Sequence, residues 1–133
     1  MDDRRQKMKQ IWIVDDDEEM ARAVQLMLEL LHCDSDSFLD ARTTARALLN
    51  GKRPDLIILD INMPDVTGLD LLEFIRRRPE LADLPVVMLS TEASDMMVDR
   101  ALELGADSYV DKPVTIEELE RAMQTAFQKR EQN

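Results

Sequence analysis

The sequence lacks the cysteines of disulfide-bonded and zinc-binding proteins and the long apolar runs of membrane-spanning proteins. Its single cysteine, Cys33, excludes an internal disulfide, and the sequence has no CxxC motif or Cys/His cluster of the kind that binds zinc. No apolar run approaches the ~18 residues that a membrane span needs. The first ten residues, MDDRRQKMKQ, are charged throughout and do not resemble a signal peptide. We therefore expect a cytoplasmic protein without a membrane anchor.

Basic residues are outnumbered by acidic ones. The 133 residues include 17 Lys and Arg against 28 Asp and Glu, which gives a formal net charge of −11. An acidic surface repels phosphate backbones, so we expect no direct binding of nucleic acid. Acidity of this size is also common in small domains whose charge only maintains solubility. The positions of particular acids are therefore more informative than their number.

Short apolar segments alternate with helical patterns along the chain. Four segments rich in branched apolar residues predict strands, at residues 11–14, 55–60, 85–90 and 108–111. A fifth segment, 32–38, is so polar that only an edge strand would tolerate it. Apolar residues at helical spacing predict five helices, around residues 20–31, 45–49, 69–75, 97–104 and 116–127. Asn50 or Gly51 is the expected left-handed end of the second helix.

This order of elements predicts an α/β fold. Segments such as DLIILD (55–60) are apolar on both faces, as strands are when helices cover both sides of a parallel sheet. The length suits one domain, which we place at residues 11–128. We expect a flexible N-terminal tail at residues 1–10 and a C-terminal tail at residues 129–133.

Polar residues stand where the predicted strands end, namely Asp15, Asp16, Asp60, Ser90 and Lys112. In an open parallel sheet, ligands bind just beyond the carboxyl ends of the strands. If the first and third strands are neighbours, three carboxylates meet there, and two unit charges ~5.5 Å apart repel by roughly 3 kcal/mol at an effective dielectric near 20. Lys112 supplies one compensating charge, and Mg²⁺, which binds carboxylate, carbonyl and water oxygens, would supply two more.

Each of these residues also has a plainer interpretation. Asp15 and Asp16 could form a solvated acidic turn before a helix, where the helix dipole favours acids. Asp60 could be a turn residue ahead of Asn-Met-Pro, Ser90 a structural hydroxyl, and Lys112 a surface lysine. Their order, with a suitable residue at the end of each of four strands, favours a shared site.

The sequence resembles the receiver domain of two-component response regulators, of the chemotaxis-regulator type, in four motifs: IVDDD, LIILDINMPDVTGLDLL, PVVMLSTEA and GADSYVDKP. The resemblance extends from about Ile11 to Phe127, which is nearly the whole chain. It implies a flavodoxin-like receiver fold, a doubly wound five-stranded parallel sheet in the order 2-1-3-4-5 with five helices.

The resemblance also implies a role for the residues at the strand ends. Asp60 matches the aspartate that takes a phosphoryl group from a histidine kinase. Asp15 and Asp16 match the acidic pair that binds Mg²⁺ together with Asp60 and the backbone carbonyl of Asn62. Ser90 matches the hydroxyl residue that donates a hydrogen bond to the incoming phosphoryl oxygen.

Further positions match residues that surround the phosphoryl group in this family. Lys112 matches the lysine that pairs with the group, and its bond to Pro113 is expected to be cis. Tyr109 matches the switch aromatic that turns inward when the hydroxyl residue moves. Asn62 and Glu92 occupy positions that resemble those of the residues that tune the lifetime of the phosphoryl group.

The implied function is a phosphorylation-activated signalling switch rather than an enzyme that turns over a substrate. The domain would catalyse only its own phosphorylation and slow dephosphorylation, and its signal would leave through the face of the fourth helix, fifth strand and fifth helix. The expected partners are a histidine kinase or phosphotransfer protein and a downstream protein. The chain would be a monomer or a phosphorylation-dependent homodimer. Asp111 departs from the family pattern, in which small or apolar residues are common, and strand alternation points it away from Lys112.

Three other interpretations remain open. A phosphohydrolase of the haloacid-dehalogenase type also uses a strand-end aspartate, but it needs a second acid two residues later, where this chain has Asn62. A flavodoxin-like cofactor module needs a phosphate cradle, and the acidic DDDEE segment would repel a phosphate. A receiver-like binding adaptor that is never phosphorylated would keep the fold without the chemistry.

Overall fold

A computed structural model describes residues 8–91 and 95–131 of the chain. The strands are β1 (Gln10–Val14), β2 (Asp34–Phe38), β3 (Leu56–Asp60), β4 (Val86–Ser90) and β5 (Ser108–Asp111). The helices are α1 (Glu18–Leu30), α2 (Ala41–Leu49), α3 (Gly68–Arg77), α4 (Asp95–Glu103) and α5 (Ile116–Glu131). The strands form one parallel sheet in the order β2-β1-β3-β4-β5. This topology confirms the predicted fold, including the edge position of the polar strand β2.

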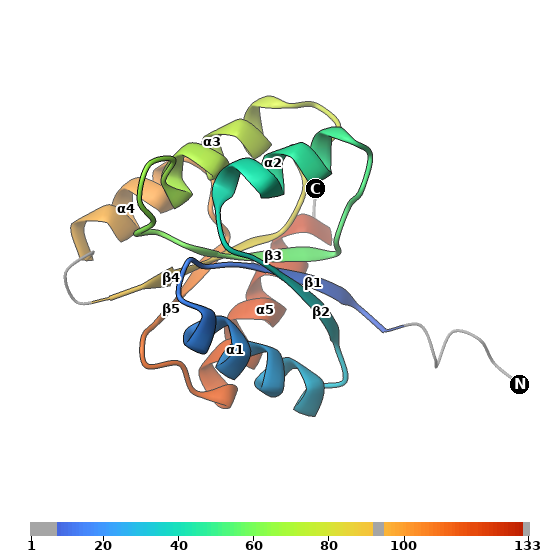
Figure 1. Cartoon of the computed structure of the whole chain (residues 1–133), viewed down its shortest axis with the longest axis vertical. Coiled ribbons are helices and arrows are strands. Elements are labelled where there is room, and N and C mark those ends of the chain that lie inside the picture. The colour runs from blue at the N-terminus through green and yellow to red at the C-terminus, as the bar shows by residue number, and fades with distance from the viewer. Residues whose placement is uncertain (1–7, 92–94, 132–133) are drawn as a thin grey trace, which may run out of the picture.

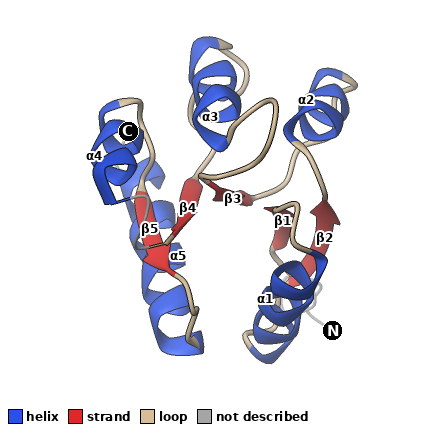
Figure 2. Cartoon of the chain, turned by 60° about the vertical axis from the view of Figure 1, so that its left-hand side comes forward, coloured by secondary structure: helices blue, strands red, loops and turns tan. Residues whose placement is uncertain are grey.

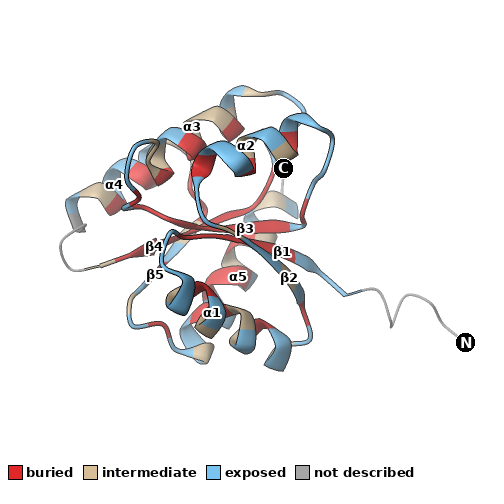
Figure 3. Ribbon diagram, viewed as in Figure 1, coloured by how far each residue is buried: buried red, intermediate tan, exposed pale blue. Residues whose placement is uncertain are grey.

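Helices cover both faces of the sheet. In Figure 1, α2, α3 and α4 lie on one side of the strands and α1 and α5 on the other, and Figure 2 shows the same division from a second direction. Each face has its own cluster of buried apolar side chains, with Trp12 and Leu59 in one cluster and Ile13 and Ile58 in the other. Strands β3 and β4 are buried along their whole length (Figure 3), which explains their uninterrupted apolar sequences. Within the described residues, each helix is too short or too polar to cross a lipid bilayer.

Side chains and glycines define the ends of several helices. The carboxylate of Asp17 accepts hydrogen bonds from two backbone N–H groups in the first turn of α1. Gly51 (φ 92°) and Gly105 (φ 110°) follow α2 and α4 in the left-handed region that favours glycine. Gly51 rather than Asn50 is therefore the left-handed residue after α2. The cap by Asp17 is important for the site, because it fixes the start of α1 directly after the acidic end of β1.

Helix α2 and strand β2 begin at other residues than the sequence predicts. Helix α2 begins earlier than its apolar spacing indicates, because Asp40 accepts a hydrogen bond from the backbone N–H of Thr43. This start signal lies in a polar segment, where a search for apolar periodicity does not find it. Strand β2 begins after His32, whose positive φ of 63° belongs to the turn that precedes the strand.

The last helix continues past residue 128, where we placed the end of the domain, and a buried ion cluster lies near its end. Arg130 Nη2 lies 2.7 Å from Asp107 Oδ1, and Arg76 Nη2 lies 3.1 Å from Asp107 Oδ2. Asp107 also accepts a hydrogen bond from the backbone N–H of Val86. This Asp107 cluster connects α3, β4 and α5, and the segment predicted as a C-terminal tail is helical to Glu131. Residues 1–7 of the predicted N-terminal tail, and residues 132–133, lie outside the described part of the chain, and Gln10 belongs to β1.

Candidate functional site

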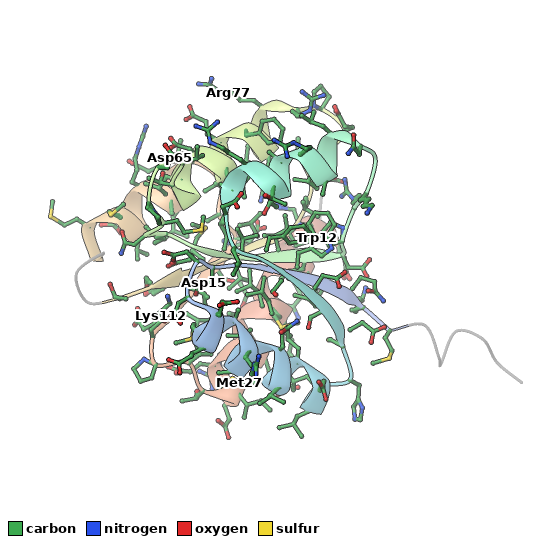
Figure 4. The ribbon with its side chains drawn as sticks, in the orientation of Figure 1. Trp12, Asp15, Met27, Asp65, Arg77 and Lys112 are labelled. Carbon is green, nitrogen blue, oxygen red and sulfur yellow. The ribbon has the colours of Figure 1, made fainter. Side chains whose placement is uncertain are left out.

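The parallel register brings the predicted site residues to one edge of the sheet. Val14 of β1 pairs with Leu59 of β3. The residues that follow them, Asp15 and Asp60, therefore lie level with each other on adjacent strands. Figure 4 shows Asp15 and Lys112 at the same end of the sheet, although the sequence separates them widely. The carboxyl ends of three strands thus contribute to one site.

The centre of this site is a group of three carboxylates, Asp15, Asp16 and Asp60, which we call the acidic cluster. One carboxylate oxygen from each residue lies within 4.8 Å of the other two. Asp15 is fully buried and Asp60 is 3% exposed, whereas Asp16 is exposed. At such separations each pair of unit charges repels by roughly 3 kcal/mol at an effective dielectric near 20. The predicted convergence of the three acids is therefore observed, and it requires compensating positive charge.

Lys112 provides part of that charge. Its Nζ lies 3.2 Å from Asp15 Oδ2 and 3.4 Å from Asp60 Oδ1, and its side chain is largely buried. Burial acts to lower the pKa of Lys112, but the charges of Asp60 and Asp15 outweigh this effect and raise the pKa above its usual value. Lys112 is therefore a cation at neutral pH. Its peptide bond to Pro113 is cis, as the resemblance implied.

The surroundings of Asp60 disfavour ionisation of its carboxyl group. Burial and the negative charge of Asp15 raise the pKa of Asp60 from 3.8 to about 6. The ammonium of Lys112 acts in the opposite direction, as does the backbone N–H of Asn62, which donates to Asp60 Oδ1 at 3.3 Å. At pH 7 the group is ionised and available as a nucleophile, and it is more basic than an ordinary aspartate.

The acidic cluster has the properties of a site for a hard divalent cation. Asp15 Oδ2 is buried and makes no hydrogen bond to any of the described residues, although Lys112 Nζ lies 3.2 Å away. Three carboxylates and one ammonium leave two negative charges in excess. Mg²⁺ binds carboxylate oxygens and keeps several waters, which the exposure of Asp16 permits. The residues that would hold this cation are Asp15, Asp16 and Asp60.

Gly68 fixes the backbone behind the carboxylate of Asp60. A Cβ atom at this position would overlap the backbone carbonyl oxygen of Asp60. The backbone N–H of Gly68 donates to the carbonyl of Ile61 at 3.2 Å, and Thr67 caps α3 with a capping box. The start of α3 is therefore packed directly against the end of β3. Sequence reasoning missed this contact, for which the one signal was a glycine immediately before a predicted helix.

Ser90 lies at the end of β4 and has a partner that the sequence did not predict. Ser90 is fully buried, and its Oγ donates a hydrogen bond to Asp111 Oδ1 at 2.7 Å. The two residues are paired across β4 and β5. Asp111 and Lys112, although adjacent, therefore have different partners, which agrees with strand alternation. Tyr109, the predicted switch aromatic, is 46% exposed.

Two of the predicted site residues lie at or beyond the margin of this geometry. Asn62 is exposed and contacts the site through its backbone N–H. Its suggested roles as a carbonyl ligand and as a tuner of phosphoryl lifetime remain predictions. Glu92 lies outside the described residues.

Comparison with known proteins agrees with the fold. The family model of the response regulator receiver domain matches residues 11–124, which include the acidic cluster, Ser90 and Lys112. Chemotaxis protein CheY of Pseudomonas aeruginosa is 34% identical over 119 residues, which are 90% of this chain and 96% of that protein. The KDP operon transcriptional regulatory protein KdpE of Escherichia coli is 35% identical over 124 residues, which are 92% of this chain and 52% of KdpE. The solved structure of chemotaxis protein CheY4 of Vibrio cholerae superimposes with a TM-score of 0.79 at 28% identity, and the match covers 90% of this chain and 99% of CheY4.

Proposed function

Because the chain belongs to the response regulator receiver domain family, we propose that it is a phosphorylation-activated switch whose phosphoryl acceptor is Asp60. Receiver domains are regulatory and interact with histidine kinases and with downstream targets. One observation carries the proposal: the buried carboxylate of Asp60 lies beside a second buried carboxylate, Asp15, and within 3.4 Å of the ammonium of Lys112. This arrangement combines a nucleophile with positive charge at the edge of the sheet where ligands bind.

In the proposed reaction, a carboxylate oxygen of Asp60 attacks the phosphorus atom of a phosphohistidine. A P–O bond forms and the P–N bond breaks. The electron pair of the broken bond stays on the imidazole nitrogen, which takes up a proton from water. The product is an acyl phosphate on Asp60. In such transfers most of the catalysis comes from positioning and from neutralisation of the charge spread over the phosphoryl oxygens.

The neighbours of Asp60 have the chemistry that this step needs. Lys112 Nζ already contacts the acceptor carboxylate and would pair with the phosphoryl oxygens. Asp15, Asp16 and Asp60 would hold Mg²⁺, which supplies positive charge to the phosphoryl oxygens when bound. The hydroxyl of Ser90 would donate a hydrogen bond to one of these oxygens.

The phosphoryl group would later be removed by water, which attacks the same phosphorus atom. The domain would thus catalyse its own phosphorylation and its own slow dephosphorylation, and we propose no other turnover. Asn62 and Glu92 each lie two residues beyond a proposed site residue, and we assign them the tuning of this lifetime. The backbone carbonyl of Asn62 is also the proposed fourth protein ligand to the cation.

We propose that the signal leaves through the face formed by α4, β5 and α5. Ser90 is paired with Asp111 across the β4–β5 ladder, so a movement of Ser90 toward a phosphoryl group would act directly on β5. Tyr109 lies on the same strand, is half-exposed, and would turn inward as Ser90 moves. The coupling free energy required is ~1–3 kcal/mol, which one or two charge-assisted hydrogen bonds supply.

The proposed partners are a histidine kinase or phosphotransfer protein upstream and a protein target downstream, with the exchange taking place in the cytoplasm. The net charge of −11 favours a protein target over nucleic acid. The relatives include both chemotaxis proteins and a transcriptional regulator, so their names do not decide the process. The chain would act as a monomer or as a phosphorylation-dependent homodimer.

Intact mass spectrometry after incubation with acetyl phosphate and Mg²⁺ tests the proposal. We expect the wild-type chain to gain one phosphoryl mass and Asp60→Asn to gain none. Asp65→Asn is a matched control, because Asp65 lies in the loop after β3, its side chain is 75% exposed, and it is paired only with Arg42 among the described residues. A wild-type chain that gains no mass, or an Asp60→Asn variant that does, would refute the assignment.

The main alternative is a receiver-like adaptor that binds a partner without being phosphorylated. It has the same fold and is compatible with the same comparisons. The acidic cluster favours the switch, because an adaptor has no need for a buried carboxylate oxygen such as Asp15 Oδ2, which accepts no hydrogen bond from the described residues. Partner binding that is equal in the presence and absence of acetyl phosphate would favour the adaptor.

A further inference from the structure

The hydrogen bond between Ser90 and Asp111 has no role in the function proposed so far. Its length of 2.7 Å, from a hydroxyl to a carboxylate oxygen, is that of a charge-assisted hydrogen bond. The sheet fixes its position, because the two residues pair in register and the backbone N–H of Lys112 donates to the carbonyl of Ser90 at 2.7 Å. The contact therefore belongs to the ordered strands.

Asp111 and a phosphoryl group on Asp60 would compete for one proton. A serine hydroxyl has a single hydrogen and donates one hydrogen bond at a time. The role proposed for Ser90, donation to a phosphoryl oxygen, therefore requires that its bond to Asp111 breaks. Each arrangement of Ser90 excludes the other.

Because Asp111 is exposed, breaking its hydrogen bond to Ser90 has only a moderate free-energy cost. Ser90 is fully buried, whereas Asp111 is exposed. When the bond breaks, water can solvate the Asp111 carboxylate, so no buried acceptor is left without a partner. The free energy that opposes phosphorylation is thus that of about one hydrogen bond, without the cost of leaving a buried carboxylate unsolvated.

We propose that Asp111 is a positioning residue that holds Ser90 in a resting arrangement and so limits how fully Asp60 becomes phosphorylated. This inference rests on the proposed function of Asp60. The chain would then need a higher concentration of phosphoryl donor to reach a given phosphorylated fraction. The reason is that the hydrogen bond from Ser90 to Asp111 must break before Ser90 can donate to the phosphoryl group. Removing the carboxylate should raise the ratio of phosphorylated to unphosphorylated chain about tenfold at a fixed donor concentration.

A double-mutant cycle tests this inference. The steady-state phosphorylated fraction with acetyl phosphate and Mg²⁺ is measured by intact mass for wild type, Asp111→Ala, Ser90→Ala and the double variant. We expect Asp111→Ala to raise the ratio about tenfold when Ser90 is present and less than about twofold in the Ser90→Ala background. Asp111→Asn, which keeps an acceptor oxygen without the charge, should lie between wild type and Asp111→Ala. Circular dichroism confirms that each variant is folded.

A second measurement separates the hydrogen bond from the mere presence of a negative charge. Asp111 is outside the acidic cluster, so calorimetry should give Mg²⁺ affinities that agree within about twofold for wild type and Asp111→Ala. An equal rise in phosphorylation in both Ser90 backgrounds, or a parallel rise in Mg²⁺ affinity, would indicate a simple field effect and overturn the inference.

The outcomes also distinguish this inference from the proposed function. If wild type is phosphorylated and Asp111→Ala behaves identically, the role of Asp111 is wrong and the switch stands. If wild type gains little phosphoryl group and Asp111→Ala gains much more, both are supported. If neither chain gains phosphoryl mass, both are wrong.

Discussion

Replacing Asp60 by asparagine should stabilise the metal-free protein while it abolishes phosphorylation. In the folded chain this carboxylate is 3% exposed and belongs to the acidic cluster, and its pKa is raised from 3.8 to about 6. In the unfolded chain the same group is hydrated and far from other fixed charges. Ionised Asp60 therefore destabilises the metal-free fold, and replacement of the carboxylate by an uncharged amide removes this effect.

The size of the effect follows from the pKa. A rise from 3.8 to about 6 is about two units, and at 1.36 kcal/mol per unit it means that ionised Asp60 destabilises the fold by about 3 kcal/mol at pH 8. This value already contains the attraction of Lys112, which lowers the pKa. A buried amide N–H without a partner would cost about 1 kcal/mol. We therefore expect a net gain of about 2 kcal/mol in the free energy of unfolding.

The gain in stability from Asp60→Asn should be larger at pH 8 than at pH 5. Between about pH 4 and pH 6, Asp60 binds more protons in the folded state than in the unfolded state, because its folded pKa is the higher of the two. Lowering the pH through this window therefore stabilises wild type relative to the variant. The contribution of the charge should fall to about half of its pH 8 value by about pH 5.

Urea denaturation in the presence of EDTA, at pH 8 and at pH 5, measures both effects. Asp65→Asn serves as the matched control and should change stability by no more than about 0.5 kcal/mol, since its carboxylate is exposed. Adding Mg²⁺ at about ten times its dissociation constant should stabilise wild type by about 1.4 kcal/mol and narrow the difference from the variant. An Asp60→Asn protein that is less stable than wild type at pH 8, or a difference that is the same at both pH values, would refute the reasoning.

Three further predictions concern other parts of the structure. Asp107→Ala should lower the free energy of unfolding by about 3–5 kcal/mol in urea denaturation, because it leaves Arg76 and a second arginine largely buried without their carboxylate; a loss below about 1 kcal/mol would contradict this. Gly68→Ala should cost about 2 kcal/mol or more and slow phosphoryl uptake, because the added Cβ would overlap the backbone carbonyl of Asp60; unchanged uptake would show that α3 can shift freely. Asp15→Asn should weaken Mg²⁺ binding at least tenfold (roughly 1.4 kcal/mol) in calorimetry through the loss of a buried anionic ligand, and an unchanged affinity would place the cation elsewhere.

Sequence patterns predicted those features that depend on neighbours along the chain. Two-sided apolar strands and amphipathic helices gave the layers of the fold, and the acids at the ends of the first and third strands predicted the acidic cluster. Predictions from apolar spacing were wrong where a polar group started a helix, as Asp40 does for α2. They also missed the Asp107 cluster, whose members come from α3, the residue before β5, and α5. No local pattern reports which distant side chains share a carboxylate.

The sequence by itself determined that polar groups stand at the strand ends, because burial of a parallel sheet leaves its carboxyl edge as the place where charged side chains are tolerated. Only the tertiary structure decided which of those groups meet. The lateral register set Asp15 level with Asp60 and placed Asp111 against the hydroxyl of Ser90. Register is fixed by the packing of both apolar faces at once, and that is a property of the whole sheet rather than of any one segment.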